Sequence, residues 1–180
     1  MHLTTSKAKR IVFSPILKTV DWLTPRCPNF VAKARYYARF HKKLDLKNPK
    51  DLNEKILWLA VKSDTREWSR LADKYAVRDY VHECGLDEIL IPCYGVWEKA
   101  EDIDYDKLPN SFIVKSTNWS ASNLVVRDKA SFPREEFYTR AQEIENHKGS
   151  CTCVGDLHYL RIKNRIMVEG LLNNDEVSAQ

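Results

Sequence analysis

The sequence predicts an α+β fold, with a basic, helical N-terminal region followed by a mixed region that contains a mostly antiparallel sheet. Helix signals, with capping residues before apolar residues at three- and four-residue spacing, are concentrated before residue 85. Short apolar runs bounded by polar or turn residues follow this region and are typical of strands. The first fifty residues include twelve Lys and Arg against two Asp, a net charge of +10 within a chain of +4.

The helices are expected in two segments. D-L-N-E, from Asp51 to Glu54, is typical of a capping box with Asp in the Ser/Thr role, and it opens the helix E-K-I-L-W-L-A-V-K. A second helix is expected from about Thr65 to a terminator at Gly85, with one buried apolar stripe. Asp73 and Lys74 are adjacent on this helix, so they point in different directions and taken alone indicate surface charges.

The strands are expected at 89–97, bent at Pro92 and Gly95, at 112–115, at 123–127 and at 165–172. A further helix begins at Pro133. We expect three regions: a basic helical arm over 1–50, a lobe carrying Asp73 and Lys74 over 51–110, and a nucleotide-binding lobe over 111–180.

The basic arm mixes charged and aromatic side chains. An amphipathic helix that packs its rings on the core and solvates its charges explains this pattern, and so does contact with an anionic membrane surface. Nucleic acid is the least favoured partner. The residues proposed for membrane or partner contact are Lys33, Arg35, Arg39, Lys42 and Lys43.

Several protein classes are disfavoured. No apolar run approaches the roughly 20 residues of a membrane-spanning helix, and the N-terminus lacks a secretion-signal pattern. Five scattered cysteines favour reduced thiols in a cytosol. Cys151 and Cys153 form half of a metal site or a turn, and no metal ligand is assigned. We expect a cytoplasmic protein that is peripheral at the inner membrane face if the basic arm binds there.

Lys115 ends an apolar strand, where its ammonium can be held as a point charge for phosphate. Hydroxyls in the connection that follows could supply further donors to phosphate oxygens. A solvated lysine at a strand end explains the same pattern. The donors are expected from Ser116, Thr117, Ser120 and Ser122.

Five ordered blocks resemble the TupA-like ATP-grasp family, named for teichuronopeptide biosynthesis and found among bacterial capsule and polysaccharide genes. They are L-K-N-P-K-D-L-N-E-K-I-L-W-L, A-D-K-Y-A-V-R-D-Y-V, L-I-P-C-Y-G-V-W, I-D-Y-D-K-L-P-N-S-F-I-V-K and H-Y-L-R-I-K-N-R-I-M-V-E. The resemblance implies that Lys74 and Lys115 contact ATP phosphates and that 116–122 is the phosphate loop. It implies that Glu169, Gly170, Leu171 and Leu172 form the hinge that binds adenine.

The resemblance also implies ATP and Mg²⁺ as cofactors and a carboxylate–amine ligase reaction, although members are often described as glycosyltransferases. Two features depart from the family pattern. The connection after Lys115 has no glycine, and the metal ligands are expected beyond Gln180, so the chain matches an N-terminal portion and no catalytic residue is assigned. The alternative is a non-catalytic nucleotide-binding or scaffold module that docks polysaccharide-assembly enzymes at the inner membrane face.

Overall fold

The computed structural model describes residues 18–119, 123–147 and 153–172 and has the expected α+β fold, with helices and a four-stranded antiparallel sheet. The chain forms two compact units. One comprises Met1–Ser69 and Gly149–Arg161, and the other comprises Arg70–Lys148 and Ile162–Gln180. These units do not follow the expected region boundaries near residues 50 and 110. Among the described residues, no helix has the length and apolar character needed to cross a membrane.

The first unit is helical. It contains α2 (Pro28–Phe40), α3 (Leu52–Lys62) and the 3-10 helix η5 (Val154–Arg161), which pack on one another. The capping box of α3 is confirmed, because the Asp51 side chain accepts from the Glu54 amide and the Glu54 side chain accepts from the Asp51 amide. The buried core residues of this unit are Val31, Ala32, Tyr36, Leu44, Leu46 and Val154.

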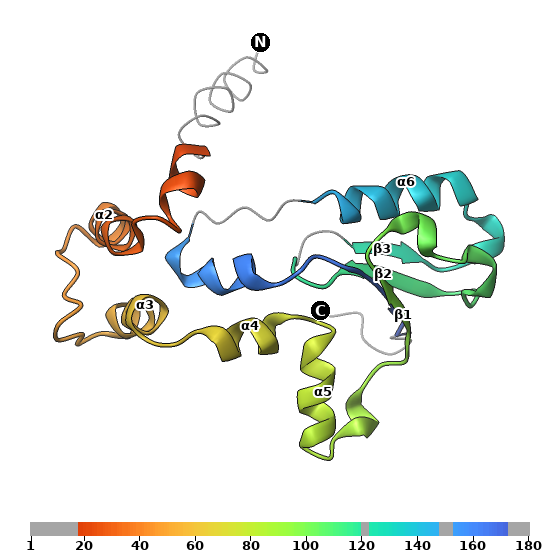
Figure 1. Ribbon diagram of the computed structural model, residues 1–180, viewed down its shortest axis with the longest axis horizontal. Helices are drawn as coiled ribbons and strands as arrows, with labels where there is room; N and C mark the ends of the chain where they lie inside the picture. The colour runs from red at the N-terminus through yellow and green to blue at the C-terminus, as the bar shows by residue number, and fades with distance from the viewer. Residues whose placement is uncertain (1–17, 120–122, 148–152, 173–180) are drawn as a thin grey trace, which may run out of the picture. The chain divides into compact units, whose positions relative to one another are not determined.

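The second unit is built on the sheet. Its strands are β1 (Cys93–Trp97), β2 (Phe112–Ser116), β3 (Asn123–Val126) and β4 (Ile166–Gly170), in the order β1-β4-β2-β3. Helix α6 (Arg134–Glu145) follows Pro133 and contacts β2, β3 and β4 (Figure 1). It buries Phe137, Ala141 and Ile144 against them. One sheet face is therefore the core.

Burial along β2 and β3 follows the period of two that a pleated sheet imposes. On β2, Phe112 and Val114 are fully buried in the core, whereas Ile113 and Lys115 are half-buried on the other face. The predicted bend in the first strand is confirmed as a register shift between Cys93 and Gly95. Gly95 is required there, because a Cβ atom would occupy the position of the Trp97 ring.

The expected continuous helix after Thr65 is wrong. The chain forms α4 (Arg66–Ala72) and α5 (Ala76–Glu83), separated by a turn, and neither helix has a fully buried residue, so the single buried stripe is also wrong. The helix breaks because Asp73 accepts from the backbone amides that start α5. Gly85 does end α5, with φ of 70° in the left-handed region, as predicted.

Short 3-10 helices complete the second unit. They are η1 (Asp87–Ile89), η2 (Ala100–Asp102), η3 (Tyr105–Lys107) and η4 (Lys129–Ser131). Helices η2 and η3 lie in the acidic segment that precedes β2.

Candidate functional site

Lys115 and Glu169 lie on the sheet face opposite α6. In the pairing of β2 with β4, Lys115 is opposite Met167 and Ile113 is opposite Glu169. Residues directly opposite in an antiparallel pair share a face, so Lys115 and Glu169 are diagonal neighbours on it. The Lys115 Nζ donates to Glu169 Oε2 at 2.8 Å.

Helix α5 supplies a second cation to the same carboxylate. Arg78 Nη1 donates to Glu169 Oε1 at 3.2 Å. The Glu169 side chain is 9% exposed, and those of Arg78 and Lys115 are 19% and 22% exposed. Glu169 is therefore a buried anion held between two partly buried cations, an arrangement in which each charge depends on its partners.

Lys74 reaches this region from the turn between α4 and α5. Its amide donates to Thr117 O at 3.0 Å, and its Nζ donates to Ser116 O at 3.0 Å and to Trp119 O at 2.7 Å. Burial, and after it the positive charge of Lys115, lower the pKa of Lys74, while the negative charges of Asp73 and Glu169 oppose the shift. The positive charge of Lys115 therefore disfavours the charged form of Lys74.

Asp73 fixes the turn that carries Lys74. Its Oδ1 accepts from the amides of Tyr75 and Ala76 at 2.9 and 3.2 Å, and its Oδ2 accepts from Arg165 Nη2 at 2.9 Å. The Arg165 guanidinium lies 4.9 Å from the centroid of the Tyr75 ring. Asp73 is 7% exposed, so its expected role as an ordinary surface charge is wrong.

The cluster has an excess of positive charge. Four cations surround two carboxylates, so the net charge of the cluster is +2. Such an excess suits a polyanion such as a nucleotide phosphate chain. The sequence pointed to only two of these cations and did not single out the two arginines. The cations are Lys74, Arg78, Lys115 and Arg165, and the carboxylates are Asp73 and Glu169.

The connection after β2 differs from the expectation. Ser116 and Thr117 are fully buried. The Thr117 hydroxyl donates to Lys163 O at 3.1 Å, and the Ser116 hydroxyl lies 2.8 Å from the side-chain oxygen of Asn164. These two hydroxyls therefore hold the fold in this structure and do not face a ligand. Ser120 and Ser122 lie outside the described residues.

The expected adenine hinge begins at the end of β4. The Gly170 amide donates to Pro92 O at 2.9 Å, so this amide is engaged within the protein. Leu171 is half-buried and Leu172 is 65% exposed. The adenine role of the hinge stays a prediction.

The five predicted basic residues of the arm are all exposed in the first unit. Lys33 and Lys43 line one groove, and Arg35 and Arg39 line another. Within the described residues, no three His, Cys, Asp or Glu side chains gather to hold a metal ion. Cys151, half of the predicted C-T-C site, lies outside the described residues.

A family model described as TupA-like ATPgrasp matches residues 54–177, which is more than half of the chain. A search of curated proteins and a search of solved structures found no match. The matched segment contains the turn of Lys74, strands β1 to β4 and the expected hinge. The chain belongs to the TupA-like ATP-grasp family.

Proposed function

We propose that the chain is the ATP-binding portion of a protein that assembles bacterial cell-surface polysaccharide. The observation that carries the nucleotide part is that Lys115 donates to Glu169 while Lys74 donates to the carbonyls of Ser116 and Trp119, which follow Lys115 in the chain. An ammonium has three N–H donors. The bonds to described residues use two donors of Lys74 and one of Lys115, so three remain for phosphate oxygens.

The reaction we propose is the one that the family resemblance implies. A carboxylate oxygen of the acceptor attacks the γ-phosphorus of ATP, ADP leaves, and an amine then displaces phosphate from the acyl phosphate. Phosphoryl transfer depends on positioning and on neutralising the phosphate charge, which is the role of Lys74 and Lys115 in this proposal. Because the described residues do not fit a metal site, we assign no Mg²⁺ ligand among them.

Calorimetry with MgATP tests the proposal on the wild type, on Lys115→Met and on Lys107→Met. Lys107 is the matched control, because its side chain is 84% exposed and bonds to Asp104 outside the cluster. The loss of one charged hydrogen bond should weaken binding to Lys115→Met about 10- to 100-fold, and Lys107→Met should bind like the wild type.

Adenosine is the second arm of this experiment. It lacks phosphate, so its affinity should be the same for the wild type and for Lys115→Met. If the wild type gave no heat with MgATP, nucleotide binding would be refuted, and a scaffold module would remain as the alternative. Equal affinity of Lys115→Met and the wild type for MgATP would refute the assigned role of Lys115.

A further inference from the structure

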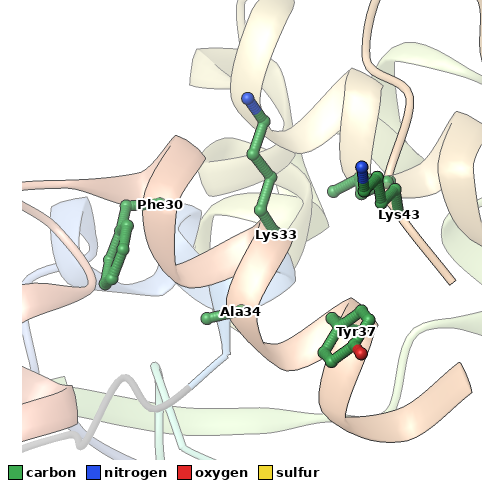
Figure 2. Close-up of a pocket in the computed structure, with 6 residues that line it drawn as sticks. Phe30, Lys33, Ala34, Tyr37 and Lys43 are labelled. Atoms are coloured by element: carbon green, nitrogen blue, oxygen red, sulfur yellow. The ribbon is translucent and has the colours of Figure 1, made fainter. Parts of the chain in front are cut away.

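A groove runs along one side of α2 in the first unit. The residues that line it precede the residues of the proposed nucleotide site in the sequence. It has a volume of about 500 Å³. Figure 2 shows the rings of Phe30 and Tyr37 on the two sides of Ala34, with the side chains of Lys33 and Lys43 beside them. Leu44 completes the lining, which is mostly apolar.

Helix geometry explains why these side chains lie together. Phe30, Lys33, Ala34 and Tyr37 follow the spacing i, i+3, i+4 and i+7, which is one side of a helix. The core of the unit takes other positions of α2, among them Tyr36. Phe30 and Tyr37 are 63% and 57% exposed, so neither ring is needed to fill the core. A groove with two exposed rings is typical of a binding surface.

The charge of the groove selects its partner. Helix α2 has the sequence P-N-F-V-A-K-A-R-Y-Y-A-R-F, without an acidic residue, and the groove holds two lysines and no carboxylate. Aromatic rings favour the boundary between lipid headgroups and acyl chains, and lysines beside them bind headgroup phosphates. The same unit contains a further basic side chain beside an exposed aromatic ring. Arg26 lies 4.4 Å from the ring of Trp22, which is 59% exposed.

The remaining basic residues of the arm do not share this groove. Arg35 and Arg39 line the other groove, together with Ile56 of α3. The charge of Lys42 acts on Asp51, whose pKa is lowered chiefly by the hydrogen bond from the Glu54 amide. Nucleic-acid surfaces are polar and strongly basic, whereas this groove is mostly apolar with two cations.

We propose that the α2 groove, through Phe30, Tyr37, Lys33 and Lys43, docks the protein on an anionic lipid bilayer. The rings enter the headgroup boundary and the two ammonium groups bind lipid phosphates. The nucleotide-site residues belong to the second unit, so membrane docking and ATP binding can be tested independently.

Flotation of the full chain with vesicles tests the proposal. One set of vesicles contains phosphatidylcholine with phosphatidylglycerol, and the other contains phosphatidylcholine alone. The wild type should float with the first set and not with the second. Each lysine near an anionic bilayer contributes about 1 kcal/mol of binding free energy, and about 1.4 kcal/mol corresponds to a tenfold change in affinity. Lys33→Gln with Lys43→Gln should therefore weaken binding about 30-fold.

Arg35→Gln with Arg39→Gln is the matched control, because it removes the same charge from the other groove and should weaken binding only about threefold by long-range attraction. Phe30→Ser should weaken binding about tenfold through lost apolar burial. Leu52→Ser changes a 70% exposed apolar residue on α3 and should bind like the wild type. All six changed positions are exposed, and circular dichroism checks that each variant is folded.

Three results would overturn the proposal. Equal losses in the lysine and arginine pairs would show that net charge alone drives binding. Equal flotation with both vesicle sets would remove the role of anionic lipid. Retention of the wild type on RNA, reversed by salt, without flotation would make the groove a nucleic-acid surface.

Discussion

Replacing Glu169 by Gln should have opposite effects on stability and on anion binding. The carboxylate of Glu169 is the shared partner of Lys115 and Arg78, at 2.8 and 3.2 Å. Gln keeps the size of the side chain and can still accept a hydrogen bond, but it removes the negative charge. The two cations then face each other with less compensation, which destabilises the folded protein.

The expected loss of stability follows from the burial of the three groups. Breaking a fully buried ion pair costs about 3–5 kcal/mol. Here both cations are about one-fifth exposed, so water compensates in part and we expect a loss of about 2 kcal/mol. For a chain of this size the midpoint of thermal unfolding should fall by about 4–8 °C.

The expected gain in anion binding comes from removing the negative charge of Glu169. A phosphate about 5 Å from the carboxylate is repelled by about 3 kcal/mol at an effective dielectric constant near 20. Screening by solvent and salt reduces this to about 1–2 kcal/mol, so Glu169→Gln should bind pyrophosphate about tenfold more tightly than the wild type.

Thermal unfolding with and without pyrophosphate measures both effects in one experiment. The variant should unfold at a lower temperature without the anion and should be stabilised more than the wild type at the same concentration of anion. Glu98→Gln is the matched control, because Glu98 forms an exposed ion pair with Lys163 and its loss should change neither quantity. A variant with unchanged stability, or with weaker pyrophosphate binding, would refute the proposal that Glu169 competes with phosphate for Lys115.

Three further predictions follow from individual side chains. Phe137→Ala should lower the free energy of unfolding by about 3–5 kcal/mol in urea, because the ring is fully buried between α6 and the sheet; a loss below about 1 kcal/mol would contradict this packing. Burial, and after it the hydrogen bond to Asp51, raise the pKa of Tyr36 to about 12. The protonated Tyr36 hydroxyl therefore stabilises the fold fully below the unfolded pKa near 10, and this stabilisation is lost as the pH rises through about 12. A spectrophotometric titration of Tyr36→Phe should lack this late ionisation, Tyr37→Phe should keep it, and its persistence in Tyr36→Phe would disprove the assignment. A bound polyanion raises the lowered pKa of Lys74, so ATP binding at alkaline pH should take up protons. Calorimetry in two buffers of different ionisation enthalpy should show this uptake in the wild type and not in Lys74→Met, and proton release by the wild type would argue against a phosphate near Lys74.

Local signals in the sequence predicted the features that depend on neighbouring residues. Asp51 caps α3 through an amide three residues away, and Gly85 ends α5 through its own backbone angle. The short apolar run in 112–115 likewise predicted a strand with Lys115 at its end. Each of these features is specified within one turn or one strand, so a short window of sequence contains its cause.

The turn around Lys74 could not be predicted in this way. Asp73 pairs with Arg165 across 92 residues, and Arg78 pairs with Glu169 across 91 residues. Apolar spacing on both sides of the turn favours a continuous helix, and only these distant partners favour the break. For the same reason the sequence indicated Lys74 and Lys115 but not the two arginines that complete the charge cluster.

The hydroxyls of Ser116 and Thr117 show a related limit. A polar residue that follows a strand is usually exposed, and this led to the expectation of phosphate donors. The segment before β4 instead covers them, since Thr117 pairs with the backbone of Arg165 and Lys163. Burial of a short polar side chain depends on which distant segment packs over it, and that information is absent from the local pattern.

The position of the charged site follows from the same pleat that builds the core. Side chains alternate along β2, so burying Phe112 and Val114 against α6 forces Lys115 onto the opposite face. A slip of one residue would place the Lys115 ammonium among the rings of the core and expose Val114. Because ionised groups are expensive to bury without partners, the hydrophobic core selects against this slip. The contacts of Phe112 and Val114 thus hold Lys115 beside Glu169.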